Sequence, residues 1–357
     1  MSLRLGVIGL DHLHVFELVQ GLLDAGANAA THVADGEFLE LYEGWRPDSV
    51  AVHPAELLAD DRIDVVVTAG IPSQRADVAV AALSAGKHVL SAKPGVTTAP
   101  DLQRLRRAVA TSGRRWSVLF TERFTNRATS EAIRLARSGA VGHVAHVIGS
   151  GPHTLNADER PAWFFDAATS GGILVDLASH QVDQFLAITG DLDAAVTAGS
   201  EGNLTHPEHP GFADIGTLCL VASADGGPVV GDHRVDLLSP AGLGTWGDVR
   251  LSIVGTEGTL EVRANIDPAG RPGAEHLILV DGEGTRRVDC SAVSLDWAQT
   301  LIEDWADGGE RLIGQAHTFA VSELTLAARS IATPWGCLLY TSPSPRDRTR
   351  SRMPSSA

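Results

Sequence analysis

Short apolar runs rich in β-branched residues alternate with segments of helical periodicity between residues 3 and 120 of the chain. Parallel strands need a long crossover connection, usually a helix, so this alternation predicts a parallel sheet with helices on both faces. The pattern indicates strands at 3–8, 31–34, 64–68, 88–91 and 116–120, and helices at 15–23, 55–59, 76–85 and 102–110.

The pattern changes after Phe120, where longer strand-like runs follow one another and glycine-rich turns separate them. That succession is typical of an antiparallel sheet. We therefore expect an α/β chain with a doubly wound parallel sheet over residues 1–122, and an α+β domain with a largely antiparallel open sheet over residues 123–336. The runs of the second domain are helix 131–138, strands 144–148, 216–222, 228–238, 249–254 and 277–280, and helix 315–332.

The last 21 residues, CLLYTSPSPRDRTRSRMPSSA, lack apolar periodicity. They resemble the translation of a sequencing-library adapter: residues 337–347 match a transposase end sequence and residues 351–357 a flow-cell primer. A natural disordered tail is the alternative. We expect residues 337–357 to be foreign to the native protein and to take no part in its fold.

The composition limits the classes of partner. The formal net charge is −16, and no large cluster of Lys and Arg lies in the body of the chain, which argues against nucleic acid and anionic membranes. No apolar run approaches the length of a membrane helix, and Met1 leads directly into the first strand without a leader pattern, so we expect a cytoplasmic protein. Cys219, Cys290 and Cys337 form no C-x-x-C pair, which argues against a zinc ribbon or a redox dithiol.

The turn after the first expected strand carries a partial dinucleotide-binding signature. Gly6 and Gly9 are present, but Asp11 and His14 stand where the second and third glycines of a pattern starting at Gly9 belong. A glycine-rich turn lets a pyrophosphate approach the backbone amides at a helix N-terminus. A tight turn in which Asp11 caps the helix is an equally good interpretation.

Two further polar residues follow strands at the edge where open parallel sheets bind ligands. Asp35 follows the second strand, and a carboxylate there can accept hydrogen bonds from an adenosine ribose and repel a 2′-phosphate. Lys93 follows the strand 88–91 and could hold a substrate hydroxyl and stabilise alkoxide character. The alternatives are a turn aspartate before Gly36 and a solvated surface lysine.

A glycine pair precedes a predicted helix that carries the strongest local signal. Asp176, His180 and Asp183 recur at i, i+4 and i+7, so they form one polar stripe opposite the apolar side of the helix. An imidazole with carboxylate neighbours is a proton-transfer unit near neutral pH. Two alternative interpretations stay open. The stripe could be an ion pair that only stabilises the helix, or a metal pair completed by His206 or His209.

An aromatic run at residues 163–165 lies just upstream of this helix. An aromatic face suits the C–H face of a sugar, so Trp163 could form one wall of a sugar site. A core aromatic cluster is the alternative.

Taken in order, these motifs resemble those of the Gfo/Idh/MocA family, named for glucose–fructose oxidoreductase and inositol dehydrogenase. Residues 82–94 are similar to the family's strand and Glu-Lys-Pro motif, with Ala92 in place of Glu. Residues 171–183 are similar to its Gly-Gly-x-x-x-Asp-x-x-x-His-x-x-Asp helix, and residues 255–260 resemble a recurrent turn of its second domain. The resemblance covers residues 3–333.

The resemblance implies a Rossmann first domain and an NAD(P)-dependent dehydrogenase, without a metal, that acts on a hydroxyl or keto group of a sugar, sugar acid or cyclitol. Asp35 favours NAD over NADP, and the resemblance implies a homodimer or homotetramer. His180 would act as general base, Lys93 would orient and polarise the reacting oxygen, and Asp176 would orient or charge-couple the site. The resemblance implies cofactor contacts at Gly6, Ile8, Gly9, Leu10, Asp11, His12, Asp35, Ala69, Lys93 and Pro94, and substrate contacts at Arg123, His153, Trp163 and Asp183.

The chain departs from the family pattern at several positions. Asp11 and His14 interrupt the glycine turn, Ala92 removes a carboxylate beside the lysine, and Arg75 stands where the family often has a histidine. Two other hypotheses therefore stay open. One is an NAD-using enzyme with net non-redox chemistry, such as glycoside cleavage or epimerisation, and the other is a non-catalytic sensor that kept the fold and lost the cofactor.

Overall fold

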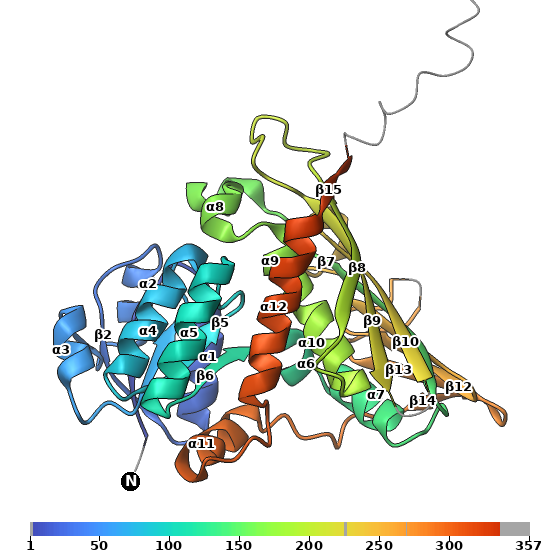
Figure 1. The fold of residues 1–357 in the computed structure, drawn as a ribbon, viewed down its shortest axis with the longest axis horizontal. Coiled ribbons are helices and arrows are strands. Elements are labelled where there is room, and N and C mark those ends of the chain that lie inside the picture. Colours follow the sequence, from blue (N-terminus) through green and yellow to red (C-terminus); the bar gives the residue numbers. More distant parts are fainter. Residues whose placement is uncertain (1–2, 225–226, 269, 336–357) are drawn as a thin grey trace, which may run out of the picture.

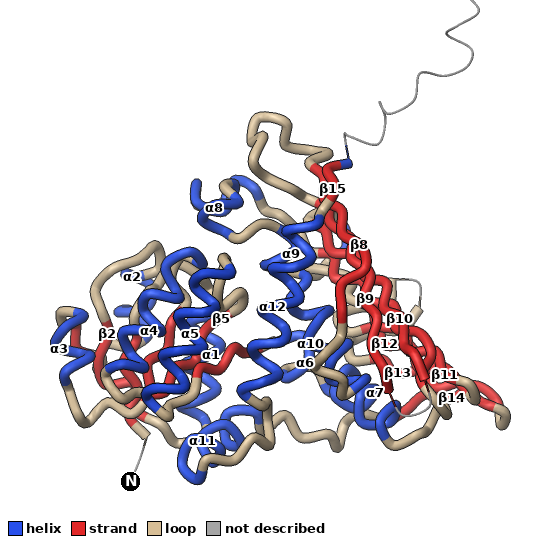
Figure 2. The backbone as a smooth tube through the Cα atoms, in the orientation of Figure 1, coloured by secondary structure: helices blue, strands red, loops and turns tan. Residues whose placement is uncertain are grey.

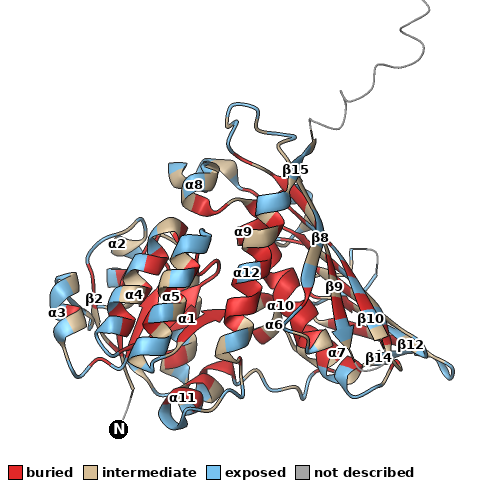
Figure 3. Cartoon of the chain, in the orientation of Figure 1, coloured by how far each residue is buried: buried red, intermediate tan, exposed pale blue. Residues whose placement is uncertain are grey.

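The computed structural model describes residues 3–335 except 225, 226 and 269 (Figure 1). Its first domain contains a six-stranded parallel sheet of order β3-β2-β1-β4-β5-β6, which confirms the expected doubly wound sheet. The central strands β4 and β5 are buried over their whole length, because helices cover both faces of the sheet. Figure 3 shows buried residues behind α4 and α5, the helices on one of these faces. The strands are β1 (Arg4–Val7), β2 (Asn28–His32), β3 (Val50–Ala51), β4 (Val65–Thr68), β5 (His88–Ala92) and β6 (Trp116–Leu119).

The helices of this domain follow from apolar periodicity and from their end residues. In α1, Val15, Leu18 and Leu22 are buried one turn apart on one face. Helix α5 begins after Thr98, whose hydroxyl accepts a hydrogen bond from the amide of Asp101, and it ends at a left-handed glycine. The helices are α1 (His14–Asp24), α2 (Leu39–Trp45), α3 (Pro54–Ala59), α4 (Arg75–Ser84) and α5 (Ala99–Ser112).

The second domain contains a nine-stranded sheet of order β14-β13-β12-β11-β7-β10-β9-β8-β15, which confirms the expected open sheet (Figure 2). The sheet is largely antiparallel, but β10 pairs with β7 and β15 pairs with β8 in parallel. The strands are β7 (Val144–Pro152), β8 (Ala195–Gly202), β9 (Ile215–Ala224), β10 (Gly227–Asp236), β11 (Arg250–Gly255), β12 (Gly258–Arg263), β13 (His276–Asp281), β14 (Gly284–Val288) and β15 (Thr333–Pro334).

Helix α10 (Ala178–Thr189) lies against the inner face of this sheet and contacts β7, β9 and β10. Every residue from Ala178 to Ile188 is buried, so α10 is a central helix with no solvent-exposed side. The other helices of this part are α6 (Thr121–Phe124), α7 (Arg127–Arg137), α8 (Ala167–Ser170) and α9 (Ile173–Asp176).

The last two helices carry the chain back to the first domain. Helix α11 (Trp297–Asp307) packs on α1, where a Cβ atom at Gly21 would lie 2.1 Å from the Trp297 ring. Helix α12 (Gln315–Ile331) contacts α5 and β6 on one side, and α10 and β8 on the other (Figure 1). The expected second domain, residues 123–336, therefore includes a segment that fastens the two sheets together.

Helices long and apolar enough to cross a bilayer are absent from the described part of the chain. The expectation that residues 337–357 are an adapter-derived tail concerns residues that lie outside the described part.

Candidate active site

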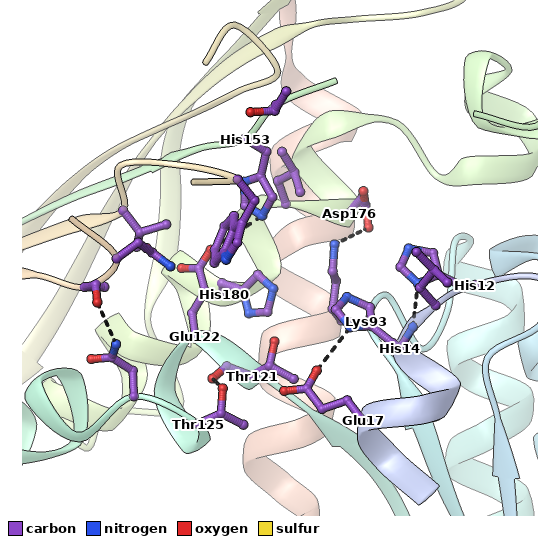
Figure 4. Close-up of a pocket in the computed structure, with 18 of the residues that line it drawn as sticks. His12, His14, Glu17, Lys93, Thr121, Glu122, Thr125, His153, Asp176 and His180 are labelled. Carbon is purple, nitrogen blue, oxygen red and sulfur yellow. Dashed lines mark hydrogen bonds and ion pairs between the residues drawn. The ribbon is translucent and has the colours of Figure 1, made fainter. Parts of the chain in front are cut away.

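A cavity of about 700 Å³ lies between the two domains (Figure 4). Lys93 reaches it from the carboxyl end of β5, the edge where parallel sheets bind ligands. Asp176 ends α9, and His180 stands in the first turn of α10. The structure thus places Lys93, Asp176 and His180 on the wall of one cavity.

Lys93 and Asp176 form an ion pair across the domain boundary. The Lys93 Nζ donates to the Asp176 Oδ1 at 2.8 Å, and their side chains are 5% and 16% exposed. Burial favours the neutral form of the Asp176 carboxyl, but the Lys93 ammonium outweighs burial and lowers its pKa. The ion pair therefore adds two charged groups to the cavity wall, and their charges cancel.

Arg75 fixes the backbone that carries Lys93. It is buried, and its Nη1 donates to the carbonyl oxygens of Ala92, Lys93 and Pro94, while its Nε donates to the carbonyl of Gly70. The position that departs from the family pattern thus clamps the end of β5 to the end of β4. We expect it to set the direction of the Lys93 side chain.

His180 presents an uncharged imidazole to the cavity. Its side chain is almost fully buried, and its Nδ1 has no hydrogen-bond partner among the described residues. Burial lowers the pKa of His180 well below its usual value, and the nearby Lys93 charge lowers it further. The neutral imidazole is the form of this side chain that can accept a proton.

Glu122, which was not among the predicted site residues, also lines the cavity. Its Oε2 accepts hydrogen bonds from the side-chain amides of Gln181 and Gln184, at 3.0 and 3.2 Å. Its Oε1 is buried without a hydrogen bond, 4.0 Å from the His153 Nε2. Burial raises the pKa of Glu122 to about 7, against the opposing effect of Lys93. This carboxyl is therefore about half protonated near neutral pH.

The raised pKa of Glu122 predicts a pH dependence of stability. The unfolded chain releases this proton near pH 4 and the folded protein near pH 7. The contribution of the protonated Glu122 carboxyl to the free energy of unfolding is therefore complete below about pH 4. It falls by up to roughly 3 kcal/mol as the pH rises through 7. Glu122→Gln keeps an acceptor for the two glutamine amides and removes the titration.

We expect urea unfolding of Glu122→Gln to show a shallower loss of stability between pH 4 and pH 8 than wild type. Glu40→Gln, a change at an exposed position in the first turn of α2, serves as the matched control and should follow the wild-type slope. Equal slopes for all three proteins would contradict the assignment.

His153 and Trp246 form the far wall of the cavity. Their ring centroids lie 4.6 Å apart, and the His153 Nδ1 contacts the Gly151 carbonyl at 3.2 Å. Burial lowers the pKa of His153 to about 3, helped by the Lys93 charge. The wall is thus aromatic and uncharged. Figure 4 shows His153 of this wall beside Glu122 and His180.

Asp183 and Arg123 do not line this cavity. Asp183 is fully buried and accepts two hydrogen bonds from Arg123, at 2.6 and 2.7 Å, and one from the His317 Nε2 at 2.8 Å. Burial opposes ionisation of Asp183, but Arg123 and His317 outweigh it and lower its pKa. The polar stripe does not face a ligand along its whole length, because α10 is enclosed by other elements. The structure therefore places this pair outside the main cavity, and their substrate contacts stay a prediction.

Trp163 lies outside the main cavity too. It packs edge-on against Phe164, whose ring neighbours Phe165, and it lines a separate cavity of about 340 Å³. His206 and His209 stack on Phe165 in the same aromatic cluster. No group of three His, Cys, Asp or Glu side chains suited to a metal ion occurs within residues 3–335 as described.

The turn between β1 and α1 has the tight geometry of a dinucleotide site. Gly9 has a φ of +90°, and a Cβ there would lie 2.6 Å from the Gly70 Cα, so the turn requires glycine at this position. Asp11 does not cap α1; its Oδ1 accepts a hydrogen bond from the Glu37 amide at 3.3 Å. The His12 Nδ1 instead accepts from the amide of His14, at 3.2 Å.

The remaining predicted cofactor residues differ in their exposure to solvent. Asp35 is exposed just beyond β2, where it can reach an adenosine ribose. Gly6 has a packing role, because a Cβ there would lie 2.6 Å from the Leu57 side chain. Ile8, Leu10, Ala69 and Pro94 are buried around the carboxyl ends of β1, β4 and β5.

Three observations indicate that a dinucleotide fits the carboxyl edge of the parallel sheet. The sheet is parallel, the turn after its first strand is tight, and an exposed carboxylate follows its second strand. Asp11 is the exception. Partial burial raises its pKa, which the Glu37 amide opposes, and its carboxyl group stands beside the position expected for the pyrophosphate.

Comparisons with known proteins agree with this architecture. Residues 5–120 match the model of the oxidoreductase family with an NAD-binding Rossmann fold, and residues 129–261 match the GFO/IDH/MocA C-terminal domain. A solved structure from Erwinia carotovora atroseptica superposes with a TM-score of 0.89 and 35% identity, over 94% of this chain and 100% of that one.

Two curated relatives are dehydrogenases. Inositol 2-dehydrogenase 1 of Saccharopolyspora erythraea is 25% identical over 94% of this chain and 96% of its own length. Levoglucosan dehydrogenase of Pseudarthrobacter phenanthrenivorans is 29% identical, over 50% of this chain and 46% of that enzyme, so the match spans about half of that relative's length.

Proposed function

The chain belongs to the Gfo/Idh/MocA family of oxidoreductases, and from that premise we propose that it transfers a hydride between a nicotinamide dinucleotide and a hydroxyl or keto carbon of a sugar, sugar acid or cyclitol. One observation carries the proposal: the Lys93–Asp176 ion pair and the uncharged His180 share one interdomain cavity at the carboxyl edge of the parallel sheet. When bound at that edge, the dinucleotide supplies the hydride acceptor or donor.

The three residues divide the remaining work. His180 accepts the hydroxyl proton, since a neutral imidazole is the form that can take one. Lys93 donates a hydrogen bond to the same oxygen and stabilises its developing negative charge. Asp176 holds the Lys93 ammonium in place and balances its charge while the site is empty of substrate.

The cavity suits a polyol. The Trp246 indole offers a flat apolar face, while His153 and Glu122 offer hydrogen-bonding groups beside it. The relatives named as inositol and levoglucosan dehydrogenases support a cyclitol or a sugar as the substrate class.

A second candidate is net non-redox chemistry through a transient ketone. Glu122 favours it, because a carboxyl that titrates near neutrality beside His153 could exchange a second proton with the substrate. Steady accumulation of reduced dinucleotide on adding a polyol would support the dehydrogenase, and product without accumulation would support the second candidate.

The cofactor preference yields a quantitative prediction. Asp35 should accept hydrogen bonds from the adenosine ribose and repel a 2′-phosphate, so NAD⁺ should bind at least about 10-fold more tightly than NADP⁺. Asp35→Ala should remove most of this difference. Asp11→Asn keeps an acceptor for the Glu37 amide and removes a negative charge, so it should tighten both dinucleotides.

Calorimetric titration of wild type and both variants with each dinucleotide checks these expectations. Asp24→Asn, at the far end of α1, is a matched control that should leave both affinities unchanged. Tighter NADP⁺ than NAD⁺ binding by wild type would contradict the role of Asp35. A cytoplasmic location and a homodimer or homotetramer stay predictions, the second of which light scattering would test.

A further inference from the structure

The loop between β7 and α8 carries a cation that the proposed mechanism does not use. Arg160 follows the short 3-10 turn η2 (Ala157–Glu159) and lines both the main cavity and the cavity of about 340 Å³. Its Nε donates to the Leu155 carbonyl at 2.9 Å, and its Cζ lies 4.5 Å from the centroid of the Phe164 ring. The guanidinium is therefore held at its Nε by the Leu155 carbonyl and on one face by the Phe164 ring.

The terminal nitrogens of Arg160 donate no hydrogen bond and form no ion pair within the described ranges. Burial lowers the pKa of Arg160, and the nearby carboxylates of Asp176 and Glu159 oppose that effect without pairing with the guanidinium. The other cations on the main cavity are neutralised, Lys93 by Asp176 and Arg127 by Glu275. A guanidinium with a free fork is suited to bidentate binding of an anionic oxygen group.

The smaller cavity separates this arginine from the turn after β1. Asp11, His12 and Leu13 line this cavity from the turn, and Glu159 lines it next to Arg160. The backbone amides of the three turn residues donate to no protein group in the described part of the chain. This is where a parallel sheet of this type places the pyrophosphate of a dinucleotide. Asp11 adds a negative charge there, so the turn alone attracts an anion less than a glycine turn would.

We propose that Arg160 binds the pyrophosphate of the dinucleotide from the side opposite the turn, so that the second domain supplies the positive charge that Asp11 offsets in the first. The inference rests on the proposed function, since it requires that the dinucleotide binds at this edge. The pyrophosphate then bridges the two domains, and the cofactor holds the loop of Arg160 closed against the turn.

Calorimetric titration with NAD⁺, ADP-ribose and adenosine tests the inference. Arg160→Gln should weaken NAD⁺ and ADP-ribose about 10- to 100-fold, and should leave adenosine unchanged because adenosine has no pyrophosphate. Arg160→Lys keeps the charge without the fork and should lie between wild type and Arg160→Gln. Arg134→Gln, a change on the exposed face of α7, should leave all three affinities unchanged. Thermal unfolding of each variant verifies that the protein is folded.

The outcomes separate this inference from the proposed function. If wild type and Arg160→Gln bind NAD⁺ with equal affinity, the role of Arg160 is overturned and the proposed function stands. A parallel titration with a panel of sugar acids covers the other source of an anion. If Arg160→Gln lost only the affinity for a sugar acid, the anion at Arg160 would be a substrate carboxylate, and the inference would also be overturned. Wild type that binds no dinucleotide would overturn both.

Discussion

His180→Ala is expected to lower kcat by about 10²- to 10⁴-fold, the usual contribution of a positioned general base. The affinity for NAD⁺ should stay within a factor of two or so of wild type, because His180 lies on the second-domain wall and not at the turn after β1. Steady-state kinetics on any substrate found for wild type, together with calorimetry for NAD⁺, measures both quantities.

The matched control is His206→Ala, which removes an imidazole outside the cavity. It should keep kcat near the wild-type value. Buffers of high pH should partly restore the activity of His180→Ala, since hydroxide can replace the missing base. An unchanged kcat in His180→Ala would contradict the assignment of the base.

Lys93→Met is expected to have two separable effects. It should lower kcat by about 10²- to 10³-fold, because the reacting oxygen loses its cationic hydrogen-bond donor. It should also destabilise the fold by roughly 3 kcal/mol, because it leaves the largely buried Asp176 carboxylate without its partner.

The double variant Lys93→Met/Asp176→Asn separates the two effects. Removing both charges should restore most of the lost stability in urea unfolding, yet it should leave kcat as low as in Lys93→Met. Recovery of activity along with stability would show that Lys93 acts only through the packing of the site. Activity equal to wild type in the single variant would contradict a role for Lys93 altogether.

The parallel sheet could be predicted because its central strands are continuous apolar runs separated by amphipathic helices. Strands β8 and β14 have mostly exposed or half-exposed residues, so no apolar pattern marked them in the sequence. The parallel pairing of β7 with β10 was also out of reach, since alternation fixes which face of a strand is buried but not which strand it pairs with.

The candidate site was predictable only in part. Lys93 and His180 follow from positional rules, a strand end and a helix stripe, and both lie in the cavity. Asp183 shares the stripe, but helical periodicity does not reveal what the stripe faces, and here it faces Arg123 and His317. Residues sharing a helix face therefore need not share a function.

The residues that sequence reasoning missed differ in kind. Glu122 carried an available signal, because it follows directly on the carboxyl end of β6, the same edge as Lys93. Trp246 and Arg160 stand in loops without periodicity, and only the approach of the two domains gives them a place on the cavity. Helix α11, whose Trp297 packs on Gly21, similarly depends on a contact between distant parts of the chain.

Oxidation of a polyol by a nicotinamide dinucleotide in this cavity can be measured directly. Wild type and His180→Ala should be mixed with NAD⁺ and each member of a panel of sugars, sugar acids and inositols, and the absorbance of reduced nicotinamide followed over time. We expect steady accumulation of reduced nicotinamide with at least one polyol in wild type and almost none in His180→Ala. No reduced nicotinamide with any polyol, together with no binding of either dinucleotide at millimolar concentration, would contradict this expectation and would favour a sensor that kept the fold without the chemistry.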